Sequence, residues 1–579
     1  MFRRALFKRN FNQRQFSNWN FTKTEVLLRS TIERKNFSQK SQIRFLTIHN
    51  INSNKFTSSS SKESTIPNNK VISFNEDSNI ALRDKAMSEL IRFYTVYKLL
   101  SIPWVVNYAS SLISIPEKLH LSWLFNWIIK RTIFLQFCGG ETDEECFDTM
   151  SKLKKHQIGT ILGPSIESDL NQNGSLSDAE KDMKFNQIAD EYLKCIKTAS
   201  KQSNNFIAVK ITGLSDPVIF KNLSLTLNSL NEIFDQFDND QDGKLVKSDL
   251  KKLFIKIFGE SETHLIDKVF DKTDSNYDRL IDRIDYYKIL LNDQNILRLI
   301  MNKSTKMNQK MDNNFNQLLV RLDELCKTAR QYKVKILIDA EQSYFQPSID
   351  YIAMRLSLRY NNLLDEDGPI IFNTHQMYRK DSASRLQRDY ELLRRNKSVF
   401  ATKLVRGAYM VGERSRAKKL GYPDPIHDNK ENTNKSYNGA VEFLLSKLYE
   451  NKRNLEVKNV NDGSSHDLNV RNNPLEFMIA SHNQETIIKA CEKLDQFGID
   501  LNSGAVYFAQ LYGMCDQITY TLGHSDYPVY KYIAYGKVNE VIPFLVRRAQ
   551  ENSSIFDGRA TVEQSMLWNE IVNRLIFWK

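Results

Sequence analysis

Short apolar runs recur along this chain, and each is followed by a longer polar or amphipathic segment of helical character. The runs are TIFLQFC (132–138), IGTIL (158–162), FIAVKI (206–211), VKILIDA (334–340), PIIFNT (369–374), FATKLVRG (400–407), EFMIAS (476–481) and VYFAQL (506–511). Nearly continuous apolar strands that alternate with helices are typical of a parallel sheet buried on both faces. Eight such units favour a closed barrel over an open sheet. The predicted fold class is therefore α/β, a distorted TIM-like (β/α)8 barrel.

The carboxyl ends of these predicted strands are unusually polar. They carry Lys210, the sequence Asp339-Ala340-Glu341, Gln376, the sequence RGAY (406–409), the sequence SHN (481–483) and Gln510. One polar strand end is unremarkable, but in a β/α barrel these ends meet at one face, where the chemistry of the fold takes place. The sequence therefore predicts a functional site at this face.

The spacing of the apolar runs is irregular in one place. About 120 residues separate the third run from the fourth, and this gap holds an internal repeat. The segment IFDQFDNDQDGKLVKSDL (233–250) aligns with VFDKTDSNYDRLIDRIDY (269–286) at a constant offset of 36. Two copies of one helix–loop–helix unit at this spacing resemble paired EF-hands, so we predict an all-α EF-hand pair inserted at 223–292.

The first repeat offers several oxygen ligands around one point, as a hard cation requires. They are the side chains of Asp238, Asp240, Asp242 and Asp249 and the backbone carbonyl of Lys244. Gly243 stands at the sharp turn, and Leu245 is the apolar residue that would pair the two loops. Because Asp249 replaces the usual bidentate glutamate, calcium binding should be weaker and magnesium should compete.

The second repeat is a poorer candidate for a calcium site. Its ligand positions are Asp274, Asn276, Asp278 and Asp285, but Arg279 replaces the turn glycine. An arginine there is strained and adds positive charge, which favours a structural role. A third match, DLNQNGSLSDAE (169–180), has no helix before it, and we interpret its Ser177 and Glu180 as a capping box that opens a helix.

Charge along the chain is uneven. Residues 1–62 are rich in Lys, Arg, Ser and Asn but contain only two acids, Glu25 and Glu33. This composition predicts a mitochondrial transit peptide that runs into a disordered linker, and hence a mature protein in the matrix. A basic arm for nucleic acid is the alternative, but no nucleic-acid module follows it.

The longest apolar stretch is LSWLFNWIIKRTIFLQF (121–137), which Lys130 and Arg131 interrupt. It is too short and too charged to span a membrane. It fits a buried or interfacial helix followed by a strand and leaves peripheral contact with the inner membrane open.

Near its end the chain carries two adjacent arginines, in PFLVRRAQEN (543–552). Arg547 and Arg548 with Glu551 could form a solvated charged face, because residues three and four apart are neighbours on a helix. Adjacent helical residues point about 100° apart. Both arginines could therefore reach one anion only if the helix lay across a pocket.

Eight stretches in a fixed order resemble the proline dehydrogenase family. They are FCGGETDEEC, AVKITGL, LIDAEQSYFQPSID, FNTHQMYRKDS, KLVRGAYM, MIASHN, FAQLYGMCDQ and YPVYKYIAYGKVNEVIPFLVRRAQEN. They cover roughly residues 130–555 apart from the EF-hand insert and a polar insert near 450–473. The resemblance implies a barrel that holds FAD, with its last helix over the mouth. It also implies hydride transfer from C5 of L-proline to flavin N5, and a membrane quinone that accepts the electrons.

The same resemblance assigns roles to individual residues. The implied substrate residues are Lys210, Asp339, Leu404, Tyr535, Arg547, Arg548 and Glu551. The implied FAD residues are Gln376, Lys403, Val405, Arg406, Gly407, Ala408, Tyr409, Ala480, Ser481, His482, Asn483 and Gln510. Relatives that act on 4-hydroxyproline have a serine at the ring-packing position assigned to Tyr535, so a tyrosine there favours unsubstituted proline. Phe544 departs from the tyrosine of many members.

These inferences give a domain plan and two rival functions. The plan is a leader and linker (1–62), a helical region (63–130), a first barrel segment (131–222), the insert (223–292), the rest of the barrel (293–560) and a C-terminal helix (561–579). The nearest rival is a 4-hydroxyproline dehydrogenase. The rival from another class is a non-catalytic calcium-binding scaffold on a barrel that has lost its chemistry.

Overall fold

The computed structural model describes residues 80–102, 122–165, 177–258, 270, 274, 278–292, 309–365, 367–462, 474–555 and 559–577. The predicted transit peptide (1–62) and the predicted ligand Asn276 lie outside them. The chain divides into two compact units. One comprises Val71–Ala408 with Asn429–Lys579, and the other comprises Met1–Lys70 with Tyr409–Asp428. The barrel, the insert and the terminal helices all belong to the first.

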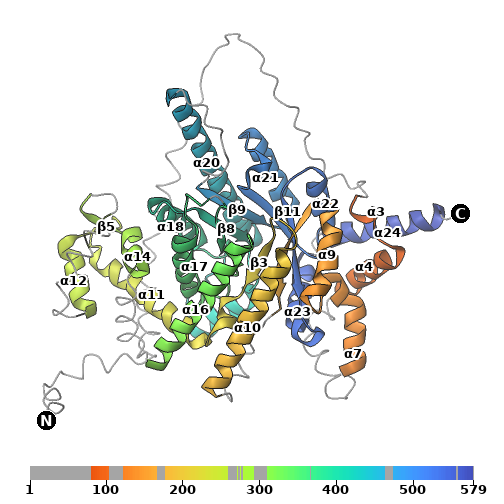
Figure 1. The fold of residues 1–579 in the computed structure, drawn as a ribbon, viewed down its shortest axis with the longest axis horizontal. Coiled ribbons are helices and arrows are strands. Elements are labelled where there is room, and N and C mark those ends of the chain that lie inside the picture. Colours follow the sequence, from red (N-terminus) through yellow and green to blue (C-terminus); the bar gives the residue numbers. More distant parts are fainter. Residues whose placement is uncertain are drawn as a thin grey trace, which may run out of the picture. The chain divides into compact units, whose positions relative to one another are not determined.

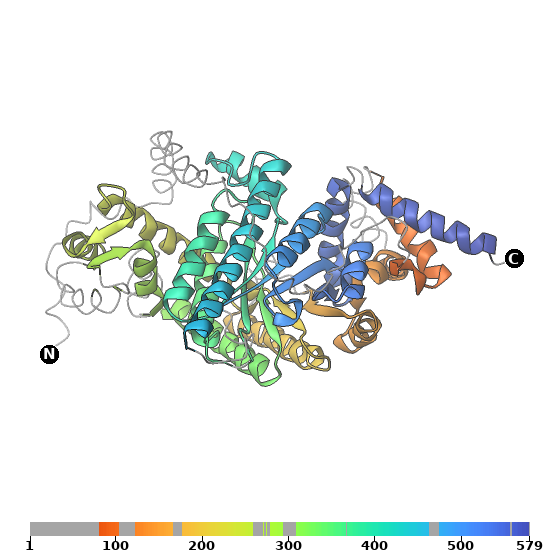
Figure 2. The same cartoon turned by 90° about the horizontal axis from the view of Figure 1, so that it is seen from above.

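Among the described residues, eight parallel strands close into a barrel, as the sequence predicts. They are β2 (Ile158–Pro164), β3 (Phe206–Val209), β6 (Lys335–Ile338), β7 (Ile371–Gln376), β8 (Phe400–Val405), β9 (Leu475–Ala480), β10 (Val506–Leu511) and β11 (Val529–Tyr535). Neighbours pair in that order, and β11 returns to pair with β2, with Val529 opposite Ile158 and Tyr535 opposite Pro164. Figure 2 shows the strands at the centre, with helices around them.

The first predicted strand is wrong. Residues 132–138 lie mainly in helical turns, η2 (Lys130–Phe134) and α8 (Leu135–Phe137), and only the short β1 (Cys138–Gly140) follows. β1 pairs with β11 outside the closed barrel. A short apolar run can be a strand or a buried helix, and periodicity alone does not separate them. The eighth barrel strand is β11, whose alternation of Tyr and Lys with apolar residues is less conspicuous.

Helices cover the outside of the barrel between successive strands (Figure 1). They are α9 (Asp143–Lys154), α10 (Asp178–Ala199), α16 (Gln309–Gln331), α17 (Gln346–Tyr360), α18 (Ser382–Arg395), α20 (Lys430–Asp462), α21 (Gln484–Gln496) and α22 (Asp516–His524). α10 opens with the predicted capping box: Ser177 accepts from the Glu180 amide, and the Glu180 carboxylate accepts from the Ser177 amide. This confirms the interpretation of Ser177 and Glu180 as a capping box that opens a helix.

Aromatic side chains fill part of the barrel interior. The Phe206 ring meets Phe372, Tyr507 and Tyr530 at centroid distances of 5.5, 5.2 and 5.0 Å, all edge to face. Edge-to-face contacts of this kind stabilise aromatic packing beyond the area buried. These rings come from the middle or amino-terminal half of their strands. The polar carboxyl ends are therefore left to form the opposite mouth.

The insert lies between β3 and β6 and consists of α11 (Pro217–Phe237), β4 (Lys244–Val246), α12 (Lys247–Phe258), β5 (Leu280–Asp282) and α14 (Arg283–Asn292). β4 and β5 pair antiparallel with Leu245 opposite Ile281, as predicted for the two loops. The insert is thus not entirely α-helical, because this short ribbon joins its loops. α14 packs against α17 and α18 of the barrel.

The remaining helices come from the ends of the chain. They are α3 (Ile80–Arg83), α4 (Met87–Leu100), α7 (Ser122–Ile129), α23 (Val538–Ile555) and α24 (Arg559–Phe577). α24 packs on α4, where Leu567 and Ile571 join Leu90 and Phe93 in one apolar cluster. None of the helices described here is long and apolar enough to cross a membrane.

Candidate active site

A charged pair lies at the carboxyl ends of two barrel strands. Lys403 Nζ on β8 is 2.7 Å from Asp339 Oδ1, which follows β6. Because side chains alternate along a strand, Lys403 shares the inward face of β8 with Ala401, which belongs to the interior cluster. The Lys403 side chain is 8% exposed and the Asp339 side chain 21%. A largely desolvated pair of this kind holds both side chains in fixed positions.

Leu404 does not lie where it was expected. It follows Lys403 on β8 and points to the opposite face, into the apolar layer between the strands and the outer helices. Its carbonyl accepts a hydrogen bond from the Tyr437 hydroxyl at 3.1 Å. The prediction that Leu404 forms a wall of the ring pocket is wrong, because strand alternation gives the inward position to Lys403.

The structure points to a different tyrosine at the site than the predicted Tyr535. Tyr535 is buried in the outer layer beside Cys195 of α10 and Cys146 of α9. Tyr532, three residues earlier on β11, faces the other side. A Cβ built on Gly163 would lie 2.6 Å from the Tyr532 hydroxyl, so this glycine makes room for it.

The surroundings of the Tyr532 hydroxyl connect it with the predicted substrate residues. Burial raises the pKa of Tyr532 well above its usual value, the Asp339 carboxylate raises it further, and the Arg548 and Arg547 guanidinium groups oppose this rise. The pKa of this one hydroxyl therefore depends on both arginines and on the aspartate. Tyr532 was missed from the sequence because β11 was not predicted as a strand. Had this strand been predicted, the alternation of its side chains would have placed Tyr532 and Tyr535 on opposite faces.

Helix α23 carries the two adjacent arginines to this place. Arg548 is buried and its guanidinium carbon lies 5.0 Å from the centre of the Phe544 ring. Arg547 is half-buried. Stacking on Phe544 fixes the plane of one guanidinium group. The side chain of Glu551 lies beyond the described residues of this helix, so its predicted contact with the arginines stays a prediction.

Lys210 directly follows β3 and is half-buried. Its backbone amide donates to the Tyr192 hydroxyl of α10 at 3.0 Å, and the short helix η4 (Ile211–Leu214) begins directly after it. The abrupt change from strand to helical turn places Lys210 at the same mouth as Asp339, whose amide donates to the Val209 carbonyl at 3.0 Å.

Arg406, directly after β8, organises a polar network. Its guanidinium donates to Asn434 Oδ1 at 2.9 Å, to Ser481 Oγ at 2.6 Å and to Thr486 Oγ1 at 3.0 Å. The guanidinium carbon also lies 4.4 Å from the centre of the Tyr437 ring. Because several partners fix this cation, it forms a preorganised site for an anion such as a phosphate.

The segment after β9 places three more predicted residues around this network. The Ser481 hydroxyl accepts from the Asn483 amide at 3.0 Å, and Asn483 caps α21 by accepting from the Thr486 amide at 2.9 Å. His482 Nε2 accepts from the Leu511 amide at 3.1 Å. The Ala480 carbonyl accepts from the Tyr437 hydroxyl at 3.1 Å. A helix start beside an arginine is a favourable place for negative charge.

Gln376 and Gly407 offer two observations on whether a cofactor fits. The buried Gln376 Oε1 has no hydrogen-bond partner among the described residues, at the inward carboxyl end of β7. Gly407 has a φ of +141°, and a Cβ there would lie 2.4 Å from the Tyr378 ring. The close approach of the Tyr378 ring explains the glycine at 407, and the Gln376 oxygen that lacks a partner suits a ligand that donates a hydrogen bond.

Other predicted FAD positions differ in what they contact. Gln510 is saturated by protein groups, since its amide donates to the Ser481 carbonyl at 3.2 Å and its oxygen accepts from Thr519 Oγ1 at 2.9 Å. The Val405 carbonyl accepts from the Met377 amide at 2.8 Å. Ala408 ends the Val71–Ala408 segment of the first compact unit, and Tyr409 begins the segment of the second unit that continues into α19 (Met410–Leu420).

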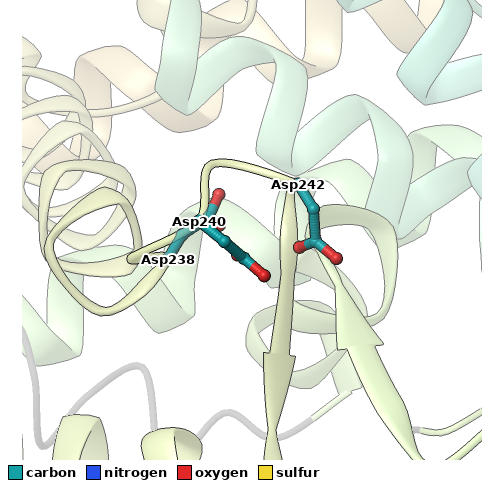
Figure 3. A group of neighbouring side chains, drawn as sticks. All are labelled: Asp238, Asp240 and Asp242. Atoms are coloured by element: carbon teal, nitrogen blue, oxygen red, sulfur yellow. The ribbon is translucent and has the colours of Figure 1, made fainter.

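A second group of charges lies in the first loop of the insert. Ligand oxygens of Asp238, Asp240 and Asp242 lie within 4.8 Å of one another (Figure 3). Asp238 is 4% exposed, and its Oδ1 lacks a hydrogen-bond partner in the described part of the chain. Its Oδ2 accepts from the Gly243 amide at 3.1 Å and lies 3.6 Å from the Arg283 guanidinium. Burial raises the pKa of Asp238, and the Gly243 amide and Arg283 only partly offset it.

The second loop repeats one turn hydrogen bond of the first but has different charges. The Arg279 amide donates to Asp274 Oδ2 at 2.9 Å, as the Gly243 amide does to Asp238, and Arg279 adopts a φ of +61°. Protein cations approach its carboxylates: Lys244 Nζ is 3.2 Å from Asp278 Oδ2. Arg395 of α18 lies 2.7 Å from Asp282 and 3.5 Å from Asp285.

Residues 147–558 match the family model described as proline dehydrogenase, which is well over half of the chain. The chain belongs to the proline dehydrogenase family. Proline dehydrogenase 1, mitochondrial, of Homo sapiens is 29% identical over 556 residues, spanning 86% of this chain and 88% of that protein. Hydroxyproline dehydrogenase of Xenopus laevis is 29% identical over 495 residues, with 85% and 88% covered.

Solved structures similar to this chain include proline utilization A from Bdellovibrio bacteriovorus, with a TM-score of 0.48 and 16% identity. That match covers 83% of this chain and 39% of the longer one. Membership of the family makes this chain an oxidoreductase that acts on the CH–NH group of proline.

Proposed function

We propose that this proline dehydrogenase uses FAD to oxidise L-proline to Δ1-pyrroline-5-carboxylate and passes the electrons to a membrane quinone. The observation that carries the proposal is that Asp339, Arg547 and Arg548 all lie close enough to the Tyr532 hydroxyl to shift its pKa. An amino acid with a carboxylate and a secondary ammonium needs cations and an anion in one pocket. The reaction would be the first step of proline degradation to glutamate.

The substrate would be held by charge and shape together. Arg547 and Arg548 would bind its carboxylate, since the planar guanidinium group suits two carboxylate oxygens better than an ammonium does. Asp339, fixed by Lys403, would accept a hydrogen bond from the ring nitrogen. Tyr532 would pack against the pyrrolidine ring and leave little room for a substituent. This orientation presents C5 to the cofactor.

FAD, when bound, would accept the hydride from proline C5 and leave the C=N bond of the product. Arg406, with Ser481 and the capped start of α21, would hold its pyrophosphate. Gln376 and the backbone at Gly407 would meet the flavin ring. Lys403 would supply positive charge beside the flavin. The other residues predicted for FAD in the first compact unit are proposed to frame this site, and the role of Tyr409 stays a prediction.

Two observations bear on the substrate and the location. Relatives named proline dehydrogenase and hydroxyproline dehydrogenase are equally similar to the chain, so identity does not discriminate between the two substrates. The bulky Tyr532 favours unsubstituted proline. The human, worm and bovine relatives carry the word mitochondrial in their names, which with the basic leader supports a mitochondrial matrix protein that contacts the inner membrane from one side.

The test is turnover with product identification. Full-length protein incubated with L-proline and a soluble electron-accepting dye should reduce the dye and yield a product lighter than proline by one hydrogen molecule. The same assay with 4-hydroxyproline should be much slower. If the dye were reduced only with 4-hydroxyproline, the protein would be a 4-hydroxyproline dehydrogenase and the proposed substrate would be wrong.

We also propose that the insert is an EF-hand pair whose first loop binds calcium. Its support is the buried Asp238, whose Oδ1 lacks a hydrogen-bond partner among the described residues, the nearby carboxylates of Asp240 and Asp242, and the pairing of the two loops. The second loop would be structural. Calcium should raise the melting temperature or change the rate of proline oxidation. Identical rates and melting temperatures with calcium and with a chelator would refute this role.

A further inference from the structure

Helix α7 turns an apolar face toward solvent. The exposed side chains of α7 and the helical turns that follow it are Trp123, Leu124, Trp127, Ile128, Arg131 and Leu135. Positions 123, 127, 131 and 135 repeat every four residues, and 124 and 128 flank them, so all six lie on one face. Trp123 is 70% exposed and Trp127 is 56% exposed. A surface helix of a globular protein normally presents its polar side to water, and this one does the reverse.

The opposite face of the same helical stretch is anchored in the protein. Phe134 and Phe137 are buried in one cluster with Val541 and Phe544 of α23. α23 also contacts α7 and η2 directly. The exposed tryptophans are therefore held on a rigid base, and that base is the helix that carries the site arginines.

A hollow of about 400 Å³ opens beside the tryptophans. Its lining includes Trp123, Trp127, Lys130, Glu141, Lys537 and Val538. The hollow thus lies between α7 and the start of α23. Its aromatic walls extend the exposed apolar face toward the barrel.

The charges around this face are mainly positive. Arg131 lies on the exposed stripe, with its guanidinium carbon 5.5 Å from the centre of the Trp127 ring. Lys130 pairs with Glu141, the acid in the lining, and Lys537 adds another cation. Tryptophan with arginine and lysine is the composition of segments that lie in the interface of a bilayer, with the rings at the depth of the headgroups. Basic side chains beside them are attracted to anionic lipids.

We infer that α7 and the hollow form a docking surface for an anionic lipid bilayer, with Trp123 and Trp127 inserted at the headgroup level. This inference rests on the proposed function, because a quinone acceptor lies in the bilayer. The anchoring through α23 would hold the barrel mouth near that acceptor. No transmembrane segment is needed, since two tryptophans, three aliphatic side chains and nearby cations suffice for peripheral binding.

The test compares the binding of full-length protein to phosphatidylcholine vesicles with and without cardiolipin. The wild type should cosediment with the cardiolipin vesicles. The double variant Trp123→Ser with Trp127→Ser should bind at least about tenfold more weakly. The matched control, Met183→Ser with Val320→Ser, removes exposed apolar side chains from α10 and α16 and should bind as the wild type does.

Proline-dependent reduction of a soluble dye is measured on every variant, and the tryptophan variant should keep it while losing reduction of a quinone embedded in the vesicles. Equal vesicle binding by wild type and tryptophan variant would overturn the inference. So would a tryptophan variant that changes the oligomeric state in solution, because the face would then bind a second copy. Vesicle binding without any proline-dependent dye reduction would refute the proposed function and leave the surface standing.

Discussion

The barrel mouth and the first loop of the insert both gather charged side chains, but they balance the charges differently. In the mouth, Asp339 after β6 meets Lys403 of β8 at 2.7 Å. In the loop, one oxygen of the buried Asp238 lies 3.6 Å from Arg283, and its other oxygen lacks a hydrogen-bond partner in the described part of the chain, with the carboxylates of Asp240 and Asp242 nearby. A charge paired by a side chain is ready for a substrate, whereas converging carboxylates are stabilised only when a cation arrives.

The second loop sharpens this contrast, because its Arg279 amide donates to Asp274 as the Gly243 amide donates to Asp238 in the first loop. Its carboxylates are approached by Lys244 and by Arg395 from the barrel. Arg395 thereby ties the second loop to α18, whereas we propose that the carboxylates of the first loop bind an ion. On this proposal, two copies of one unit take different roles through a few substitutions.

The largest effect should follow from breaking the pair in the mouth. Asp339→Asn removes the acceptor for the substrate nitrogen and leaves Lys403 nearly buried without its counter-ion. Loss of one partner from a buried charged pair typically costs about 2–5 kcal/mol. We expect kcat/KM for proline to fall by about two to three orders of magnitude.

The matched control is Asp365→Asn, which breaks a pair with Arg330 of 2.6 Å outside the mouth. Steady-state rates of both variants, measured at equal flavin content, show whether the loss of activity is specific to the pair in the mouth. Equal losses in the two variants would mean that Asp339 acts only through stability.

The next effect distinguishes two tyrosines of β11. Tyr532→Phe removes the hydroxyl whose pKa Asp339, Arg547 and Arg548 shift. The variant should lower kcat/KM for proline by about tenfold, which corresponds to the loss of one hydrogen bond to a charged group. Tyr535→Phe changes a hydroxyl in the outer layer and should stay within about twofold of the wild type. Rates with proline and 4-hydroxyproline measure this, and a larger effect at Tyr535 would reverse the assignment.

A smaller effect is expected in the first loop. Burial raises the pKa of Asp238, so its ionisation at neutral pH opposes folding when no cation is bound. Asp238→Asn should therefore raise the melting temperature in chelator, by a few degrees for about 1 kcal/mol, and abolish stabilisation by calcium.

The pH dependence has a definite sign. The folded apo protein binds a proton at Asp238 more readily than the unfolded chain does. Its stability in chelator should therefore gain as pH falls through the raised pKa, and calcium should cancel the gain. Thermal melts across mildly acidic pH, with and without calcium, give the answer. If calcium still raised the melting temperature of the Asp238→Asn variant, the calcium site would have to lie elsewhere in the protein.

The smallest effect should come from the second loop. Arg395→Gln removes the cation beside Asp282 and Asp285 and should lower the free energy of unfolding by about 1–3 kcal/mol, the cost of a charged hydrogen bond. The loss should be the same with calcium and with chelator. Recovery of stability on adding calcium would show that the second loop also binds the ion once Arg395 is gone.

Most of the barrel could be predicted from apolar runs, because buried parallel strands are short and nearly continuous in hydrophobicity. The run at 132–138 failed for a physical reason: Phe134 and Phe137 are spaced as on a helix, and their burial against α23 could not be read locally. β11 was missed because its tyrosines and Lys531 make it appear polar.

The site was predicted by a resemblance that carries no information on strand parity. Asp339 directly follows β6, and its carboxylate pairs with the inward Lys403, while Leu404 and Tyr535 lie on the opposite face of their strands. Their orientation depends on strand register, which motifs do not carry. The role of Arg395 in the second loop could not be predicted either, because it joins segments more than 100 residues apart.

The most direct test of the central claim is the visible spectrum of the full-length protein before and after addition of L-proline without oxygen. The account predicts a flavin band that proline bleaches and that 4-hydroxyproline bleaches far less. A colourless protein, or a bound flavin that proline leaves oxidised, would contradict it.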